Sequence, residues 1–433
     1  MKKDSGRISG QRSDRILKKE VLILIMEFGF TEEQEKLRKE LHDFYANELP
    51  KDIAGVPALS KELQDFWMDL QRKAGKKGYL APGWPKETGG LGLGHMEVGI
   101  ANEVEGYWGI SWPDGIGLHI VGPGLHLFGT EEQKKRFLPE ISSGEKIWYE
   151  CFTEPEAGTD EANQQTRAVK RGDKWVINGQ KIFITGGYKP DWLYVEARTA
   201  DTIPKHRGLT LFCVKADTPG VTVTALPCMG GYRANIFYFD NVEVGDDAIV
   251  GQINQGFYHV MQTFEFERSN TAGAVRAKRE LQELIHFCRE TKRNGKPLIK
   301  DPKVRRALAK MAIDIEVLRL AAWRTAWRFG ERKRLGPLDF DLTGLFSRLN
   351  AFSHPDLKMD ILGTYGQLRM GSKYAMLDGS IERGWQVTRS YHYAGTMEAI
   401  KIVLAGRVLG LPRIPAKLHT TIMQALQEKE KQA

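Results

Sequence analysis

The chain of 433 residues contains few cysteines and no long apolar run. Its four cysteines (Cys151, Cys213, Cys228 and Cys288) show neither metal-ligand spacing nor the pattern of a disulfide framework. This scarcity predicts a reducing compartment: a cytoplasmic location, with an organellar matrix as the alternative. The apolar run at 21–26, VLILIM, is too short to span a membrane and lacks the cleavage site of a signal peptide.

Excess positive charge is also scarce over most of the chain. The net charge is +8, and residues 1–25 supply +4 of it, from seven Lys/Arg against three Asp/Glu. A surplus this modest, without a basic stripe of interleaved aromatics, excludes a nucleic-acid groove and suits a phosphate-bearing small ligand. We expect residues 1–25 to be a disordered or non-native extension, with a targeting segment as the alternative and Met26 as the candidate start.

The sequence shows no repeats and no alternation of strands with helices, which excludes a Rossmann-type sheet. Helical periodicity dominates 26–149, a period of two follows over 150–254, and helical periodicity returns over 255–433. These ranges predict an α+β fold with an N-terminal helical domain, a small middle β domain and a C-terminal helical domain. Thr31 with Gln34, and Thr130 with Gln133, have capping-box spacing, which predicts helix starts.

Two local signals make sharper predictions. Within KWVINGQKIFIT, 174–185, the Asn178-Gly179 pair predicts a tight turn between two short strands. Asp301-Pro302 predicts a helix that begins with proline in its first turn.

The segment FEFER, 264–268, interrupts an apolar helix face. The preceding residues of that face are Phe257, Val260, Met261 and Phe264. Its next inward positions are Glu267 and Arg268, although burying a carboxylate costs several kcal/mol unless it is paired, hydrogen-bonded or neutral. The residues themselves allow two interpretations, a buried ion pair or a general base at Glu267.

Three further segments are candidate ligand sites, each with an ordinary structural alternative. TEPEAGTD, 153–160, combines acceptor side chains with a glycine and could equally be a simple turn. At 183–187, Phe183, Thr185 and two glycines could face a flat ring, or Phe183 could belong to the core. Thr396 begins an amphipathic helix whose amides could hold an anion. The glycine-rich GGLGLG at 89–94 follows no strand and is not a nucleotide-binding fingerprint.

Several segments in order resemble the acyl-CoA dehydrogenase family. They are WPKETGG at 84, FGTEEQKKRFLP at 128, TEPEAGTD at 153, WVINGQKIFIT at 175, FDNVEV at 239 and RVLGLPR at 407. The resemblance covers about residues 26 to 413, nearly the whole chain. It implies a C-terminal four-helix bundle, FAD bound between the domains, an acyl-CoA thioester substrate and no metal.

The resemblance also locates the general base. Many members carry a catalytic glutamate in a Tyr-Glu-Gly-Thr motif of the C-terminal helix, whereas this chain reads Tyr393-Ala394-Gly395-Thr396. A second branch, with the isovaleryl-CoA and long-chain enzymes, keeps its glutamate before an arginine on the first helix of the C-terminal bundle. That position is Glu267, followed by Arg268. The resemblance therefore implies that Glu267 is catalytic and that Arg268 and Phe264 contact the substrate.

For the cofactor, the resemblance implies roles for six residues. They are Thr153 and Thr159 near the isoalloxazine or pyrophosphate, Phe183 and Thr185 beside the ring, and Thr396 and Glu398 where the closing helix approaches the FAD. Two positions depart from the family pattern, since Thr291 replaces an arginine and Asp360 a glutamine that meet the partner subunit's FAD. Arg293 is the candidate replacement.

The expected function is α,β-dehydrogenation of a branched, cyclic or bulky acyl-CoA, with electrons passed to an electron-transferring flavoprotein. We expect a homotetramer built as two dimers. The alternatives are one subunit of a heteromeric dehydrogenase and a flavin-free scaffold relative.

Overall fold

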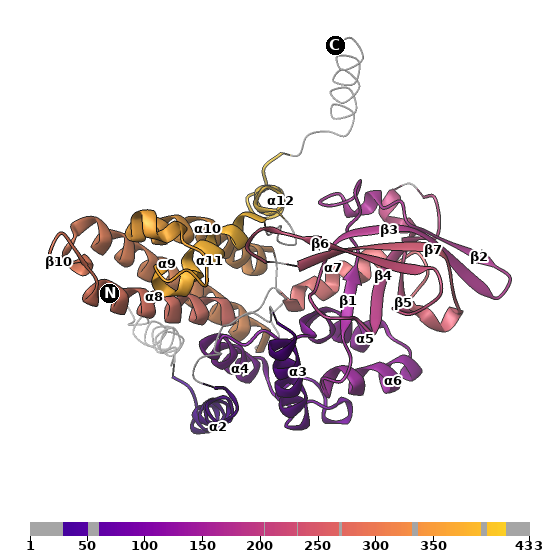
Figure 1. Ribbon diagram of the computed structural model, residues 1–433. Coiled ribbons are helices and arrows are strands. Elements are labelled where there is room, and N and C mark those ends of the chain that lie inside the picture. Colours follow the sequence, from indigo (N-terminus) through magenta and orange to yellow (C-terminus); the bar gives the residue numbers. More distant parts are fainter. Residues whose placement is uncertain are drawn as a thin grey trace, which may run out of the picture.

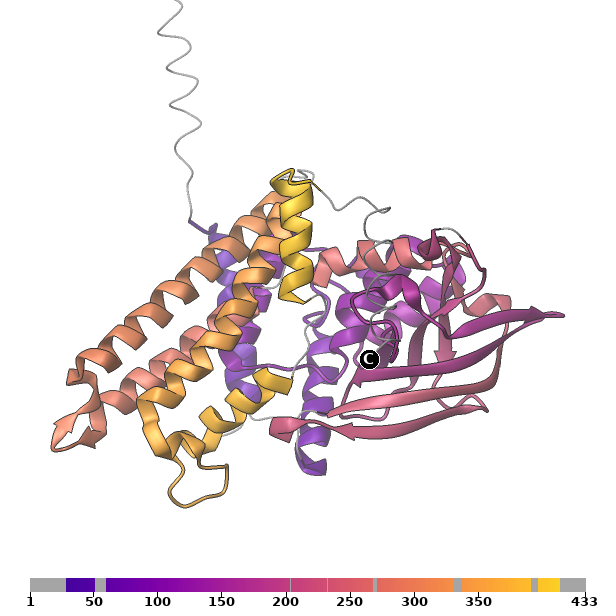
Figure 2. The same ribbon diagram turned by 90° about the horizontal axis from the view of Figure 1, so that it is seen from above.

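The computed structural model of the chain describes residues 29–50, 60–202, 204–231, 233–267, 271–330, 337–390 and 396–412 (Figures 1 and 2). Within these ranges, the side chains of 265–267, 337–340 and 390 are not described.

The N-terminal domain consists of helices, some of which cover one face of the sheet while others lie against the C-terminal helices (Figure 1). The helices are α2 (Glu32–Glu48), α3 (Lys61–Lys76), α4 (His95–Trp108), the π-helix η2 (Gly117–Val121), α5 (Gly122–Phe128) and α6 (Glu131–Ser142). Both predicted capping boxes are confirmed, because Thr31 and Thr130 each accept the backbone N–H three residues on while the glutamine side chain accepts theirs.

The middle domain is an eight-stranded mixed sheet. Its strands are β1 (Trp148–Cys151), β2 (Arg167–Arg171), β3 (Lys174–Thr185), β4 (Trp192–Arg198), β5 (Leu209–Lys215), β6 (Val221–Pro227), β7 (Arg233–Val244) and β8 (Ile249–Val250). They run in the order β6-β7-β3-β2-β4-β5-β8, with β1 parallel to β4. The middle strand β4 is buried on both faces: Tyr194 packs toward the N-terminal helices, while Leu193 and Val195 belong to the core on the other face.

The prediction of a turn at Asn178-Gly179 is wrong. Residues 174–185 form the single strand β3, and Gly179 occupies an irregularity in its pairing with β7. Gly179 has φ +149°, and a Cβ there would lie 2.4 Å from the Thr166 hydroxyl oxygen, so a side chain has no room. The glycine serves a close approach of two strands instead of a turn.

The hairpin lies earlier in the chain, between β2 and β3. Arg171 pairs with Lys174, and Gly172 between them takes φ +60°. Gly172 and Asp173 form this two-residue turn, and the glycine supplies the left-handed backbone that such a turn requires.

The C-terminal domain is helical, as predicted. Its helices are α7 (Gly256–Glu267), α8 (Ala272–Glu290), α9 (Pro302–Gly330), α10 (Pro337–Leu362), α11 (Ser380–Ser390) and α12 (Met397–Val403), with a small hairpin of β9 (Lys292–Arg293) and β10 (Lys296–Pro297). Helices α8 to α11 share one apolar core. The helix expected at Asp301-Pro302 is confirmed, since α9 begins at Pro302 and the Asp301 carboxylate accepts the Lys303 N–H at 2.8 Å.

Helix α7 lies between the sheet and this bundle (Figures 1 and 2). Its residue Val260 is fully buried in the core that the N-terminal helices share with the sheet. The helix that ends at Glu267 is thus held by the first two domains rather than by the core of α8 to α11.

The N-terminal helix α4 connects the domains at the start of α8. A Cβ on Gly106 would lie 2.3 Å from the Ala272 carbonyl oxygen, so the two backbones are in direct contact. The buried Thr271 hydroxyl donates to the Gly99 carbonyl at 2.7 Å. Glu103, buried on the same helix, accepts from the Arg319 guanidinium of α9 at 2.7 Å. These contacts fix the chain immediately after the α7–α8 junction.

Two classes of structure are absent from the described part of the chain. No helix there has the length and apolarity needed to cross a membrane. The same residues hold no cluster of histidine, cysteine, aspartate or glutamate suited to a metal ion.

Candidate active site

Glu267 is the last residue of α7. The buried residues of this helix are Gly256, His259, Val260 and Thr263. Continued by one turn, their spacing of three and four residues predicts that position 267 lies on the same face. Met261, expected on that face, is instead 37% exposed. Arg268, the predicted substrate contact, lies outside the described residues.

The loop at 153–160 begins beside α7. The ring of Phe152, at the end of β1, lies 6.3 Å from the ring of Phe264 on α7. The carbonyl of Thr153 accepts the Ile182 N–H of β3 at 2.9 Å. The structure therefore brings Thr153, Phe264 and the end of β3 together, while Thr159 lies in the exposed outer part of the loop.

Phe183 has an unusual backbone conformation. It takes φ +60°, the left-handed region that costs a residue with a side chain about 1–2 kcal/mol. The pairing of β3 with β7 shifts register between Lys181 and Ile184, which places the strain at Phe183. The aromatic side chain is 53% exposed, and Thr185 follows it, also exposed. Strained residues of this kind are concentrated at ligand sites, so the core interpretation of Phe183 is set aside.

The end of β3 lies at the boundary with the helical bundle. Thr185 pairs with Ala234 of β7. The loop that connects β6 to β7 rests on α11, where the Gly230 N–H donates to Gln386 at 2.9 Å. Helix α12 stands at the same boundary (Figures 1 and 2). Its N-cap is Thr396, whose hydroxyl accepts the Ala399 N–H, and the exposed Glu398 follows two residues later. Tyr393, Ala394 and Gly395 lie outside the described residues.

Arg293 does not join this group. It lies on the β9–β10 hairpin, at the end of the bundle remote from the sheet (Figure 1). Its guanidinium donates to the Ile361 carbonyl at the end of α10, over 2.6 Å. Thr291 at the end of α8 and Asp360 at the end of α10 belong to the same region. Within one chain, these three residues are separated from Thr153 and Phe183.

A buried ion pair beneath the 153–160 loop was not predicted from the sequence. The side chain of Lys181 is fully buried, and its Nζ lies 2.8 Å from a Glu154 carboxylate oxygen. The signal was available, because Lys181 stands at an inward position of the alternating strand β3, where an apolar residue is expected.

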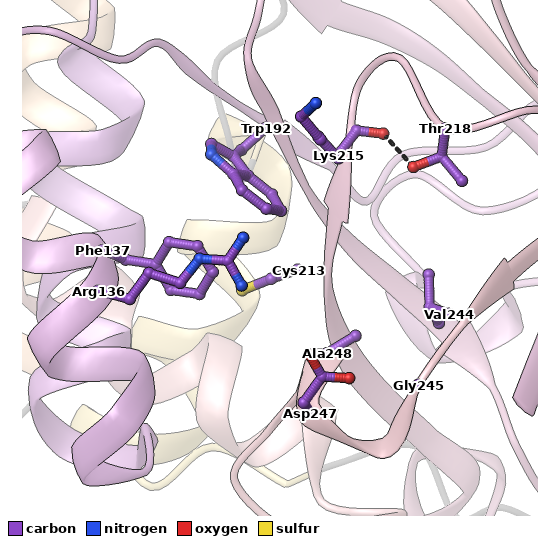
Figure 3. A pocket seen from close by; sticks show the side chains of 10 residues that line it. All are labelled: Arg136, Phe137, Trp192, Cys213, Lys215, Thr218, Val244, Gly245, Asp247 and Ala248. Atoms are coloured by element: carbon purple, nitrogen blue, oxygen red, sulfur yellow. Dashed lines mark hydrogen bonds between the residues drawn. The ribbon is translucent and has the colours of Figure 1, made fainter. Parts of the chain in front are cut away.

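A separate hollow of about 180 Å³ opens where α6 meets the sheet (Figure 3). Arg136, Trp192 and Lys215 line it, and the Arg136 guanidinium stacks at 4.9 Å from the Trp192 ring. None of the predicted site residues is among its lining residues. The hollow therefore does not correspond to the predicted site.

Comparisons with known proteins assign most of the chain to one family. Family models for the acyl-CoA dehydrogenase N-terminal, middle and C-terminal domains match residues 31–145, 150–242 and 254–409. Acyl-CoA dehydrogenase FadE26 of Mycobacterium tuberculosis is 31% identical over 90% of this chain and 99% of its own. The chain belongs to the acyl-CoA dehydrogenase family. It is accordingly an oxidoreductase of a flavin-dependent family.

Solved structures of this acyl-CoA dehydrogenase fold include two described as two-component complexes. The ChsE4-ChsE5 complex of Mycobacterium tuberculosis matches with a TM-score of 0.80 at 30% identity, over 90% of this chain and 100% of that chain. The Tcur3481-Tcur3483 steroid acyl-CoA dehydrogenase matches with a TM-score of 0.81 at 30% identity, over the same shares. PigA with FAD and proline, at 20% identity, 89% coverage of this chain and a TM-score of 0.76, shares the fold alone.

The residues at the end of β3 fit an isoalloxazine ring. Phe183 offers an exposed aromatic surface on a backbone held by strand pairing. Thr153, whose carbonyl accepts from Ile182, and Thr185 at the end of the strand add hydroxyl groups on either side of Phe183 along β3, which suits the polar edge of a flat heterocycle. When FAD is bound, Thr153, Phe183 and Thr185 would hold its ring, and Thr396 would approach it from α12.

The backbone strain at Phe183 gives a direct test. Phe183→Ala and Phe183→Gly both remove the ring, but only glycine takes φ +60° without a steric cost. The flavin-free glycine variant should therefore be about 1 kcal/mol more stable toward urea than the alanine variant. Both should bind FAD several-fold more weakly than the wild type. Equal stability of the two variants would show that the left-handed backbone is not strained.

Proposed function

We propose that this chain is an FAD-dependent acyl-CoA dehydrogenase that converts a bulky acyl-CoA into the 2,3-enoyl-CoA. The observation that supports it most directly is the position of α7. This helix ends at Glu267 beside the Thr153 loop, and its Phe264 ring stands near Phe152. Electrons would then pass to an electron-transferring flavoprotein.

The chemistry explains this arrangement. A thioester carbonyl acidifies the α-hydrogen only modestly, so a carboxylate must stand over Cα, which is the role of Glu267. Arg268, the next residue, would hydrogen-bond the substrate. A bound flavin would supply the acceptor for the hydride that leaves Cβ. Both hydrogens leave in one geometry, so positioning supplies much of the rate, and base catalysis adds about 10²–10⁴-fold.

Replacement of the base tests the assignment. Glu267→Gln keeps the shape of the side chain but cannot accept a proton, so turnover should fall at least about 100-fold while bound flavin is unchanged. Glu265→Gln, two positions away on the same helix, is the matched control and should retain activity. Turnover of Glu267→Gln within about tenfold of the wild type would contradict the role. Moving the carboxylate, as Glu267→Ala with Ala394→Glu, should restore part of the activity.

The proposed substrate class is a branched, cyclic or polycyclic acyl group. Ala394 is smaller than the glutamate that many relatives carry there, and the base comes from another helix. The related structure named a steroid acyl-CoA dehydrogenase supports the same class by analogy.

The substrate class can be measured with a panel of thioesters and a dye acceptor. Cyclic, branched and steroid side-chain CoA esters should give kcat/KM at least tenfold above that of butyryl-CoA. A preference for butyryl-CoA over every bulky thioester would overturn this proposal and leave the role of Glu267 intact.

We propose assembly through α9. Ile313, Val317 and Leu320 are 64%, 47% and 57% exposed, and their spacing of four and three places them on one helix face. Exposed apolar faces of this kind mark protein contacts. The proposed occupant is a second copy of this chain, giving a homotetramer of two dimers with one FAD per chain and Arg293 facing the partner's cofactor.

Flavin absorbance combined with light scattering tests the assembly. The pure wild type should have the mass of four chains and about one FAD per chain. Leu320→Glu should lower the mass and the flavin content together, whereas Arg306→Glu, on the charged part of α9, should change neither.

The heteromer is the second candidate, favoured by the two-component names of the related structures and by Thr291 and Asp360. It predicts a flavin-poor chain whose flavin content and activity rise when a partner chain is added. A colourless protein that no partner restores would indicate the scaffold.

A further inference from the structure

The ammonium group of Lys181 has an acceptor for each of its three N–H donors. Its Nζ lies 2.8 Å from the Glu154 carboxylate, 2.6 Å from the Gln164 side-chain oxygen and 3.1 Å from the Phe152 carbonyl. An ammonium group has three N–H donors, so these acceptors satisfy it completely without water. A fully buried lysine is rare because burial removes its hydration, and it persists only when paired in this way.

The acceptors of Lys181 surround a predicted flavin contact. Phe152 and Glu154 are the two neighbours of Thr153, and the Thr153 carbonyl accepts from Ile182, the residue after Lys181. Lys181 thus bonds the backbone carbonyl before Thr153 and the side chain of the residue after it. Phe183, the strained aromatic, follows on the same strand, so Lys181 also fixes the distance between the loop and the ring-facing residue.

The partner Glu154 is ionised. Burial acts to raise its pKa, but the charge of Lys181, the hydrogen bond from it and those from Gln165 and Thr166 outweigh burial and place the pKa below its usual value. The Thr166 N–H lies 3.0 Å from the carboxylate. The pair is therefore a true ion pair, which ties the 153–160 loop to the residues that lead into β2.

We propose that Lys181 is a positioning residue for the flavin, acting through Phe152, Thr153 and Glu154 rather than by contact with the cofactor. The inference rests on the proposed function, because it presupposes FAD at this loop. In this role, Lys181 fixes the position of the Thr153 hydroxyl relative to the Phe183 ring.

The charges around Lys181 extend the argument. Gln164 connects Lys181 to Glu196, which hydrogen-bonds Glu161, and burial above all raises the pKa of both carboxyl groups. Arg198, also buried, donates to the Gln164 carbonyl at 3.0 Å. The charge of Lys181 thus opposes the effect of burial at three carboxyl groups, those of Glu154, Glu161 and Glu196. Loss of Lys181 alone leaves the Glu154 carboxylate without its cation, so a neutralising second change is needed in the test.

The test compares Lys181→Met with the double variant Lys181→Met/Glu154→Gln. The single change leaves a buried carboxylate unpaired, which destabilises the fold strongly, whereas removal of both charges restores much of the stability. The double variant still lacks the bond to the Phe152 carbonyl. The double variant should therefore recover at least half of the decrease in unfolding temperature that the single variant shows. It should still bind FAD at least tenfold more weakly than the wild type. Lys174→Met, at the exposed start of the same strand, is the control and should match the wild type.

Amide hydrogen exchange in the flavin-free protein supplies a second measurement. The Ile182 N–H reports directly on the Thr153 carbonyl, and it should exchange at least tenfold faster in the double variant. Wild-type FAD affinity or unchanged Ile182 exchange in the double variant would overturn the proposed role of Lys181 and leave the proposed function intact. A wild-type protein without FAD affinity, alone or with a partner chain, would overturn the proposed function instead.

Discussion

The direct backbone contact between α4 and the start of α8 is the constraint on which the candidate site depends. Gly106 permits it, and the Thr271 hydroxyl bonded to Gly99 holds its register. At the opposite end of α7, Gly256 lies against the backbone of Leu209 in β5. The three domains therefore meet along α7 and at the start of α8.

The sequence predicted best those features that depend on neighbours in the chain. Thr31, Thr130 and Asp301 begin helices because their side chains cap amides two or three residues away, and spacing alone reveals this. The α+β layout followed from the change in hydrophobic period. The turn predicted at Asn178-Gly179 is wrong for the opposite reason. The role of Gly179 is set by its contact with Thr166, just before the neighbouring strand β2, and no pattern of residues adjacent in the chain reveals that contact.

The candidate site was predictable only in part, again for physical reasons. Glu267 is a candidate because a carboxylate violates an apolar pattern, and Thr153 is one because of family motifs. The strain at Phe183 results from a register shift between β3 and β7, and the burial of Lys181 from the packing of the 153–160 loop over the sheet. Both arise from long-range pairing, so single-sequence periodicity does not encode them. The separation of Arg293 from the sheet of the middle domain likewise depends on how the helices of the bundle pack.

The position of Arg293 has a thermodynamic consequence. If Arg293 neutralises the diphosphate of FAD, as proposed, it does so across a boundary between chains, because it lies at the far end of the bundle. Cofactor affinity and subunit association are then two sides of one linked equilibrium, in which each strengthens the other by the same free energy. Dilution of such a protein loosens its flavin, and an excess of flavin holds its subunits together. The colour of the solution would then report protein concentration in a nonlinear way.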